Sequence, residues 1–247
     1  MIRDLTFLER FLSGKHLLES EGVLAIHDAI GQLEGALDER VPKNKKAPPA
    51  WEFEILPERS LRFVYSTDGP LLQPDLFCRF SGPSDNEWPW KQQSLVVRLW
   101  STRKDLTARG EYDSKKVIKI LQNRNWQRVV ARMHFDKEDT GEKVPLFHLQ
   151  FGGKAPDEAR ELCWLPSQID VPRLPYHPVD VVLASELIVA NFFPSVFGTL
   201  RNEPEWRALI ARSQHRALKR YTEVCQSSCS VPHALNDKTL LMHLINA

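Results

Sequence analysis

The sequence has few cysteines, few glycines and no long hydrophobic run, and each shortage excludes a class of protein. It holds 4 cysteines in 247 residues, too few for a secreted disulfide framework and compatible with a reducing cytoplasm. No apolar run approaches the roughly 20 residues of a membrane-spanning helix. The 11 glycines are few for an enzyme that wraps a nucleotide, and Gly-rich phosphate loops, His-Glu-x-x-His and Gly-x-Ser-x-Gly are missing. We therefore expect a cytoplasmic protein with no membrane segment and no cofactor.

The chain also lacks a net charge of either sign. Its 33 Lys and Arg residues nearly balance 32 Asp and Glu residues, for a formal charge of +1. This balance excludes a uniformly basic or acidic protein, although it allows a local charged patch. Glu9 and Arg10 interrupt the first apolar positions, so we expect no secretory signal. With 42% hydrophobic residues, the composition is that of a folded globular protein with a core.

The first 40 residues have the pattern of helices. Leu5, Leu8 and Leu12 predict a short helix. Apolar residues then recur at spacings of three and four, which places them along one side of a second helix; they are Val23, Ile26, Ile30, Leu33 and Leu37. This region is acidic, with eight Asp/Glu against four Lys/Arg. The proline- and lysine-rich connector Val41–Pro49 cannot continue a helix, so we place a boundary there.

From Trp51 to about Gly153 the hydrophobic period changes to two, which is typical of half-buried strands. Six segments alternate in this way: Trp51–Ile55, Leu61–Tyr65, Leu76–Phe80, Leu95–Leu99, Arg128–Asp136 and Phe147–Phe151. One basic helix, from about Ser114 to Gln127, is inserted among them. We predict a central, largely antiparallel six-stranded sheet with one buried face and one solvent-exposed face.

The remainder of the chain begins as a proline-rich connector and ends in helices. Val179–Phe193 is apolar nearly all round, which predicts a buried helix that Pro194 ends. A longer amphipathic helix follows from about Asn202, and we place five cations on its outward side: Arg207, Arg212, Arg216, Lys219 and Arg220. The expected fold class is α+β. Its parts are an N-terminal helical region (1–40), a sheet core (51–153) and a C-terminal segment (154–247), or one continuous domain.

Positive charge concentrates in one stretch. Residues 91–135 hold eleven Lys/Arg and only three Asp/Glu. The cations that we expect to bind nucleic acid or another anion are Arg98, Lys115, Lys116, Lys119, Arg124, Arg128 and Arg132, with Arg62 and Arg79 on the same face if the alternation holds. Clustered cations bind phosphates and release counterions from a polyanion, and Trp100 and Trp126 lie nearby for base stacking. The alternative is that Glu52, Glu54, Asp136 and the acidic N-terminal helices neutralise this face internally.

Two histidines lie on the last predicted hairpin. If Phe135 lies opposite Phe147, then His134 lies opposite His148, with Asp136 beside them. Cross-strand Cβ atoms are about 5 Å apart, so the imidazoles could form an acid–base pair for phosphodiester cleavage or part of a metal shell. The alternative is two histidines on a solvated face, each bonded to a neighbour.

One spacing is typical of a metal site, namely Cys225-x₃-Cys229-x₃-His233, with His243 or Cys163 as a fourth ligand. Thiolates and imidazoles suit tetrahedral Zn²⁺. Structural zinc sites more often have two residues between their cysteines, and only three ligands are local here. Free cysteines at a helix end are therefore the favoured interpretation, and we expect no bound metal.

Two segments, Phe147–Gly153 and Pro172–Phe193, resemble uncharacterised bacterial proteins associated with mobile and defence-related gene clusters. The resemblance brings no established catalytic residues. It implies a prokaryotic intracellular protein that works beside a larger partner.

These patterns leave two classes of function. The first is a non-catalytic subunit or adaptor of a bacterial assembly, for example in anti-phage defence, whose basic face contacts nucleic acid or an acidic partner. In this interpretation the C-terminal helices dock on a larger protein. A third possibility, an inhibitory or antitoxin-like binder, has the same sequence features as such a subunit. The second is a small phosphodiesterase or nuclease-like effector that uses His134, His148 and Asp136. The missing catalytic motifs favour the first.

Overall fold

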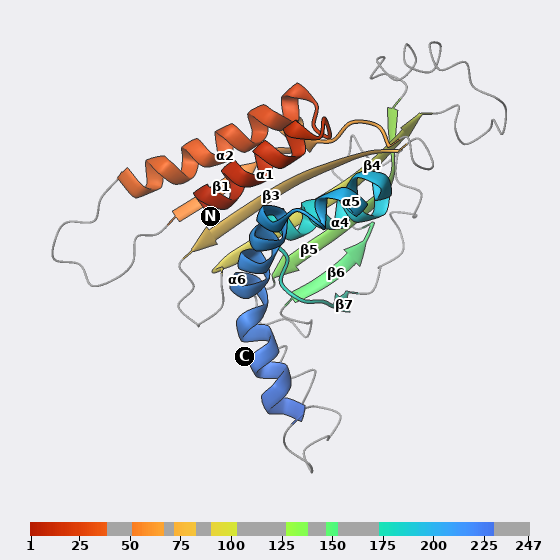
Figure 1. The fold of residues 1–247 in the computed structure, drawn as a ribbon. Helices are drawn as coiled ribbons and strands as arrows, with labels where there is room; N and C mark the ends of the chain where they lie inside the picture. Colours follow the sequence, from red (N-terminus) through yellow and green to blue (C-terminus); the bar gives the residue numbers. More distant parts are fainter. Residues whose placement is uncertain are drawn as a thin grey trace.

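Figure 1 shows the fold in a computed structural model, which describes residues 1–38, 51–66, 72–82, 90–102, 127–137, 147–152 and 173–229. Helices occupy both ends of the described chain and strands its middle. In order the elements are α1 (Ile2–Gly14), α2 (Ser20–Asp38), β1 (Trp51–Ile55), the 3₁₀ turn η1 (Pro57–Arg59), β2 (Leu61–Arg62), β3 (Gln73–Gly82), β4 (Gln92–Thr102), β5 (Gln127–Lys137), β6 (Phe147–Phe151), β7 (Leu174–Pro175), α4 (Val181–Phe192), α5 (Pro194–Leu200) and α6 (Pro204–Cys229).

The strands form one antiparallel sheet in the order β1-β3-β4-β5-β6-β7, with β2 pairing the same strand, β3, as β1 does. Each of the six alternating segments contributes a strand, so the predicted α+β class with N-terminal helices is confirmed. β2 is shorter than predicted because Phe63 leaves the ladder to bridge Leu18. The additional strand β7 was not predicted, since two residues that include a proline carry no alternation.

Several predicted segments lie outside the described residues. They are the connector Val41–Pro49, nearly all of the basic helix, and most of the proline-rich segment that follows residue 153. The predicted end of the basic helix is wrong, because Gln127 already begins β5.

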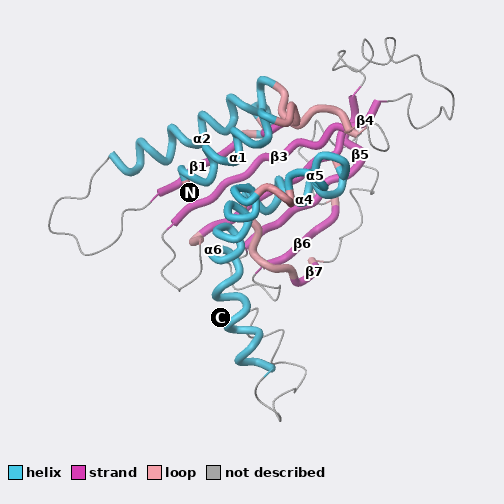
Figure 2. The backbone as a smooth tube through the Cα atoms, in the orientation of Figure 1, coloured by secondary structure: helices cyan, strands magenta, loops and turns pink. Residues whose placement is uncertain are grey.

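All described helices lie on one face of the sheet (Figure 2). α1 and α2 lie over the β1 side, whereas α4 and α5 lie over the middle strands and α6 continues past the sheet. The buried apolar side chains form one cluster to which all three predicted parts contribute; it includes Leu8, Ile26, Phe53, Leu95, Phe135, Ile188 and Trp206. Burying each such side chain stabilises the fold by about 1.5–3 kcal/mol. Within the described ranges, no helix combines the length and apolar character needed to cross a bilayer.

The approach of α2 to the sheet depends on a glycine. A Cβ atom at Gly22 would lie 2.5 Å from the backbone oxygen of Arg62. The same carbonyl accepts a hydrogen bond from the backbone N–H of Glu19, at 3.1 Å. Glycine therefore lets the start of α2 contact the backbone of β2 directly.

The outer side of β1 is capped by a side chain of α2. The carboxamide of Gln32 donates to the backbone oxygen of Glu54 at 3.0 Å and accepts from the backbone N–H of the same residue at 2.8 Å. These two groups of Glu54 point away from β3, where an edge strand would otherwise leave them without a protein partner.

Asp180 begins α4 and joins it to α6. Its carboxylate accepts from the backbone N–H of Leu183 at 3.0 Å, which caps the helix. It also accepts from Ser213 Oγ at 2.6 Å and from Arg216 Nη2 at 2.6 Å. The side chain of Asp180 is 1% exposed, so three donors replace the water that it loses on folding.

Asp4 extends this contact to α1. It accepts from Arg216 Nη1 at 2.8 Å and from Arg212 Nε at 2.8 Å. Burial alone would raise the pKa of Asp4, but the two arginines outweigh burial and hold that pKa below its ordinary value. The prediction that Arg216 faces outward is therefore wrong, because Asp4 and Asp180 draw its guanidinium group inward, whereas the side chain of Arg212 remains 40% exposed while it bonds to Asp4. We call Asp4, Asp180, Arg212, Ser213 and Arg216 the helix cluster.

Candidate functional sites: the polar sheet face and the Glu186 pocket

Most of the described candidate residues lie on the side of the sheet away from the helices, which we call the polar face. Directly paired residues of an antiparallel sheet point to the same side. The register Asp75–Arg98–Arg132 therefore places three charged side chains in one row across β3, β4 and β5. By the same alternation, the face also carries Ser94, His134, Asp136 and His148.

Arg98 and Asp75 form a buried ion pair within this row. Arg98 Nε and Nη2 donate to the two oxygens of Asp75 at 2.9 and 2.6 Å. Ser60 Oγ donates to the same carboxylate at 2.7 Å, and Arg98 also reaches the backbone oxygen of Pro57 at 2.9 Å. The side chains of Arg98 and Asp75 are 14% and 0% exposed. Contact between Arg98 and a phosphate would require this bidentate pair to open.

The neighbouring arginines of the row are also held by the protein itself. Arg132 is 6% exposed, and its Nε donates to the backbone oxygen of Gly152 at 2.8 Å. The guanidinium groups of Arg62 and Arg98 lie 5.9 and 5.0 Å from the ring of Trp100, within cation–π distance. The expectation of a solvent-exposed face is therefore wrong for this row, where carboxylate, carbonyl and aromatic partners replace water.

The other predicted cations are distributed differently. Arg79 is exposed and forms an ion pair with Glu52, as the alternative of internal neutralisation predicts. Arg128 lies opposite Ser101, beyond a register shift between Leu99 and Trp100, so simple alternation no longer assigns its side. The cations of the basic helix lie outside the described residues; they are Lys115, Lys116, Lys119 and Arg124.

The predicted register of the histidine hairpin is wrong by two residues. Phe135 pairs with Leu149 rather than Phe147, and His148 pairs with Asp136 rather than His134. A slip of two residues keeps every side chain on its predicted face. His134, Asp136 and His148 therefore still share the polar face, but Asp136 lies directly opposite His148 and His134 lies opposite Gln150.

Both histidines are largely buried, unlike the two imidazoles of a solvent-accessible acid–base pair. Burial, followed by the charge of Arg132, lowers the pKa of His134 to about 4, so its ring is neutral at pH 7 and has no proton to donate as a general acid. Its Nδ1 lies 3.9 Å from Asp136 Oδ2, while Ser94 Oγ donates to the other oxygen of Asp136 at 2.8 Å. His148 is 3% exposed, which limits access to substrate.

The candidate metal site lies partly outside the described residues. Cys225 is a half-buried free cysteine on α6, and Cys229 is the last residue of the helix. His233 lies beyond the described chain. Among the residues that the structure describes, no three His, Cys, Asp or Glu side chains come together as a set of metal ligands.

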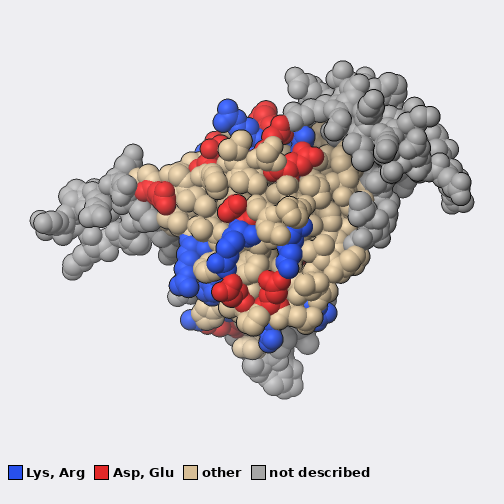
Figure 3. Space-filling model, turned by 45° about the horizontal axis from the view of Figure 1, so that its top comes forward, with Lys and Arg blue, Asp and Glu red and all other residues tan. Residues whose placement is uncertain are grey.

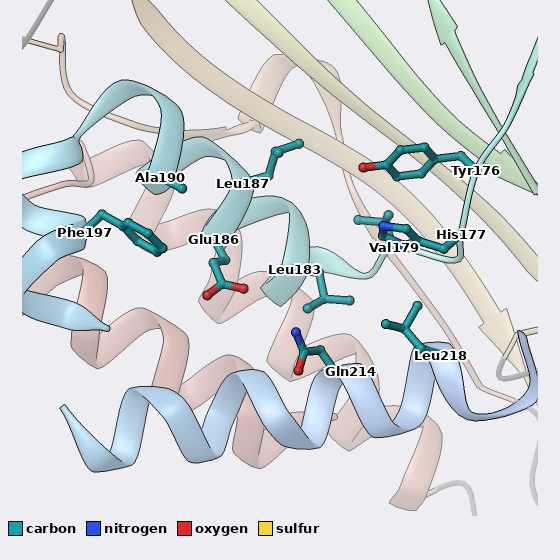
Figure 4. Close-up of a pocket in the computed structure, with 10 residues that line it drawn as sticks. All are labelled: Tyr176, His177, Val179, Leu183, Glu186, Leu187, Ala190, Phe197, Gln214 and Leu218. Atoms are coloured by element: carbon teal, nitrogen blue, oxygen red, sulfur yellow. The ribbon is translucent and has the colours of Figure 1, made fainter. Parts of the chain in front are cut away.

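A second candidate site is a cavity of about 300 Å³ between the helices and the chain that leads into α4 (Figure 4). We call it the Glu186 pocket. Most of its wall is apolar and comes from Val179, Leu183, Leu187, Ala190, Phe197 and Leu218. Four side chains add polar groups: Tyr176, His177, Glu186 and Gln214. An apolar cavity with a few polar groups is the usual form of a small-ligand site.

The acid in this pocket has no hydrogen-bond partner among the described residues. Within that part of the chain Glu186 also forms no salt bridge, and burial raises its pKa against the opposing charge of Arg201. Gln214 on α6 faces Glu186 across the cavity in Figure 4. At the other end, His177 Nδ1 lies 3.0 Å from the backbone oxygen of Pro178. When the ring is neutral, this contact places the proton on Nδ1 and leaves Nε2 as an acceptor.

No family model, curated protein or solved structure matches this chain. Sequence reasoning missed the Glu186 pocket because its walls come from three helices and a loop. One signal was present in the sequence: Glu186 is the single charged residue of the otherwise apolar segment Val181–Phe192. A single carboxylate in a mostly apolar helix marks a candidate site, because burying even part of its charge favours a partner.

Proposed function

We propose that this protein is a non-catalytic subunit or adaptor of a multi-protein assembly and that it binds an anionic partner, either nucleic acid or an acidic protein. The observation that supports this proposal is the state of the polar face. Asp75 is committed to Arg98, Asp136 accepts from Ser94, and His134 is neutral. Polar groups that satisfy one another in this way make a structure rigid and specific, which favours a structural role for the polar face.

The phosphodiesterase alternative is weaker for a specific reason. Acid–base catalysis at neutral pH needs one imidazole that accepts a proton and one that donates a proton. His134, with a pKa near 4, is a poor base and no acid at pH 7. The buried position of His148 also separates it from a phosphate in solution.

We assign contact with the anion to predicted cations other than Arg98 and Arg132, and these cations lie outside the described residues. Arg98 and Arg132 are held in the buried row, which leaves the basic segment with Lys115, Lys116, Lys119 and Arg124 as the main contact. Figure 3 shows a different surface, where Lys and Arg atoms lie beside Asp and Glu atoms instead of forming a field of one sign. Ion pairs such as Lys15–Glu203, at 2.7 Å, fit this mixed pattern.

The test is binding of the full chain to labelled single- and double-stranded DNA and RNA, and to a polyglutamate peptide, across a salt series. We expect affinity to fall steeply with salt. Replacing Lys115, Lys116, Lys119 and Arg124 with alanine should reduce the slope of log K against log salt by about 3 to 4 for duplex DNA. The control is Arg59→Ala. Arg59 is an exposed arginine on η1 that lies beside Asp28 of α2.

Two results would overturn the proposal. One is the absence of binding to every polyanion at low salt. The other is cleavage of a nucleic acid that His148→Ala abolishes without changing the melting curve, which would establish the enzyme instead.

A further inference from the structure

The Glu186 pocket has the size and shape of a site for a small molecule. Its volume of about 300 Å³ is at the lower end of the range for ligand cavities. α4 forms one wall, with Leu183, Glu186 and Leu187, while α6 forms the opposite wall (Figure 4). Because most of the wall belongs to packed helices, most of the cavity exists before a ligand arrives, which lowers the entropic cost of binding.

The polar groups of the pocket specify the charge of its ligand. Glu186 is a half-buried acid with no hydrogen bond or salt bridge to the described residues, and the apolar side chains around it cannot replace the part of its hydration that burial removes. A cation would provide the missing partner and form charge-assisted hydrogen bonds with the carboxylate. In Figure 4 the Gln214 carboxamide on the facing wall turns its nitrogen toward Glu186, and a flip of this amide presents its oxygen to a further N–H of the same cationic group.

The other end of the pocket specifies a second polar group. His177 presents Nε2 as an acceptor when its ring is neutral, because Nδ1 is engaged with the Pro178 carbonyl. The Tyr176 hydroxyl has no hydrogen-bond partner among the described residues and points toward α4 (Figure 4). These groups favour a ligand with a hydroxyl or N–H at the end remote from its positive charge.

We propose that the Glu186 pocket binds a small organic amine, with the ammonium group on Glu186 and Gln214 and a compact apolar body against Leu183, Leu187 and Phe197. A hydrogen-bond donor at the far end of the amine contacts His177. This site is independent of the anionic partner proposed above, since it uses different residues and the opposite charge.

Three matched probes test the charge preference: tyramine, its neutral analogue tyrosol, and the anion 4-hydroxyphenylacetate. All three share a phenol ring and differ in the group that would meet Glu186. Calorimetry at pH 7 should show tyramine binding in the millimolar to high-micromolar range. Tyrosol should bind about tenfold more weakly or worse, and 4-hydroxyphenylacetate should not bind. Equal affinity for the three probes, or no binding of tyramine at millimolar concentration, would refute the proposal.

Three variants locate the site. Glu186→Gln keeps the shape of the side chain and should reduce tyramine affinity by about tenfold or more. Ala190→Phe fills the cavity and should abolish binding while the charge of Glu186 remains. Glu205→Gln, an exposed acid at the start of α6, should leave affinity unchanged. Loss of binding in Glu205→Gln, or full binding in Ala190→Phe, would show that tyramine binds through general surface charge and not in the pocket. Melting curves of each variant confirm that the fold is intact.

Discussion

Helix α4 has one carboxylate at its start and another in its second turn, and the two differ in every contact. Asp180 is almost completely buried and accepts hydrogen bonds from Leu183, Ser213 and Arg216. Glu186 is half-buried and makes no hydrogen bond or salt bridge with the protein. An acid with three donors stabilises the packing of the helices around it. An acid without donors contributes little to folding and is free to meet a ligand.

The largest effect is expected at Asp180. In Asp180→Ala, α4 loses its N-cap and Arg216 loses one of its two carboxylates, so we expect the free energy of unfolding to fall by about 4 kcal/mol. Chemical denaturation at pH 7 measures this loss. Asp28→Ala, which removes an exposed acid 3.7 Å from Arg59, should change stability by less than about 0.5 kcal/mol. A loss below about 1 kcal/mol in Asp180→Ala would contradict a structural role for the helix cluster.

Asp75 extends the comparison to the polar face. Asp75→Ala leaves Arg98 buried without its carboxylate and should lower the free energy of unfolding by about 3 kcal/mol. The double variant Asp75→Leu, Arg98→Met removes both charges and should recover at least half of that loss, because no unpaired charge remains. A double variant as unstable as the single one would show that hydrogen bonds to Ser60 and Pro57, and not charge pairing, dominate this site.

His134 is intermediate, since it is mostly buried but carries no charge at pH 7. Its folded-state pKa of about 4 lies below the ordinary histidine value of 6.5, so the unfolded chain takes up a proton at a higher pH than the folded protein. Stability should therefore fall as pH falls from about 7.5 to 5, by about 2 kcal/mol from this residue. In His134→Gln the free energy of unfolding should fall by about 2 kcal/mol less between pH 7.5 and pH 5 than in the unmodified protein. Chemical denaturation at both pH values measures this difference. An unchanged pH dependence in His134→Gln would contradict the low pKa.

The smallest effect is expected at Glu186. Because Glu186 forms no hydrogen bond or salt bridge with the described residues, Glu186→Gln should change the free energy of unfolding by no more than about 0.5 kcal/mol, in the stabilising direction, since a half-buried charge is removed. Thermal and chemical denaturation without added ligand check this result. A large loss would mean that Glu186, like Asp180, has a structural role.

The sheet could be predicted from local pattern, whereas the pairing of distant charges could not. Alternation assigns each side chain to a face, which is why the strands and the shared face of Arg98 and Arg132 are as expected. Alternation is unchanged by a slip of two residues, so it could not decide which residue of β6 lies opposite His134.

The helix cluster and the Glu186 pocket also could not be predicted from the local hydrophobic pattern, because their residues come from helices that are distant in the sequence. A helical projection of α6 places Arg216 outward because it cannot include Asp4, more than two hundred residues earlier in the chain. Only the packed arrangement of α1, α4 and α6 brings these charges together. The same packing leaves Glu186 and Gln214 facing each other across a cavity.

The two hydrogen bonds from Gln32 to Glu54 have a consequence for assembly. The carboxamide presents one N–H and one carbonyl to β1, as a residue of an added strand would do. A peptide from another chain that extends the sheet at β1 must first displace this side chain and match both of its bonds. Gln32 therefore competes with strand addition at β1. Gln32→Ala would leave the backbone N–H and C=O of Glu54 available to pair with a strand of a neighbouring chain.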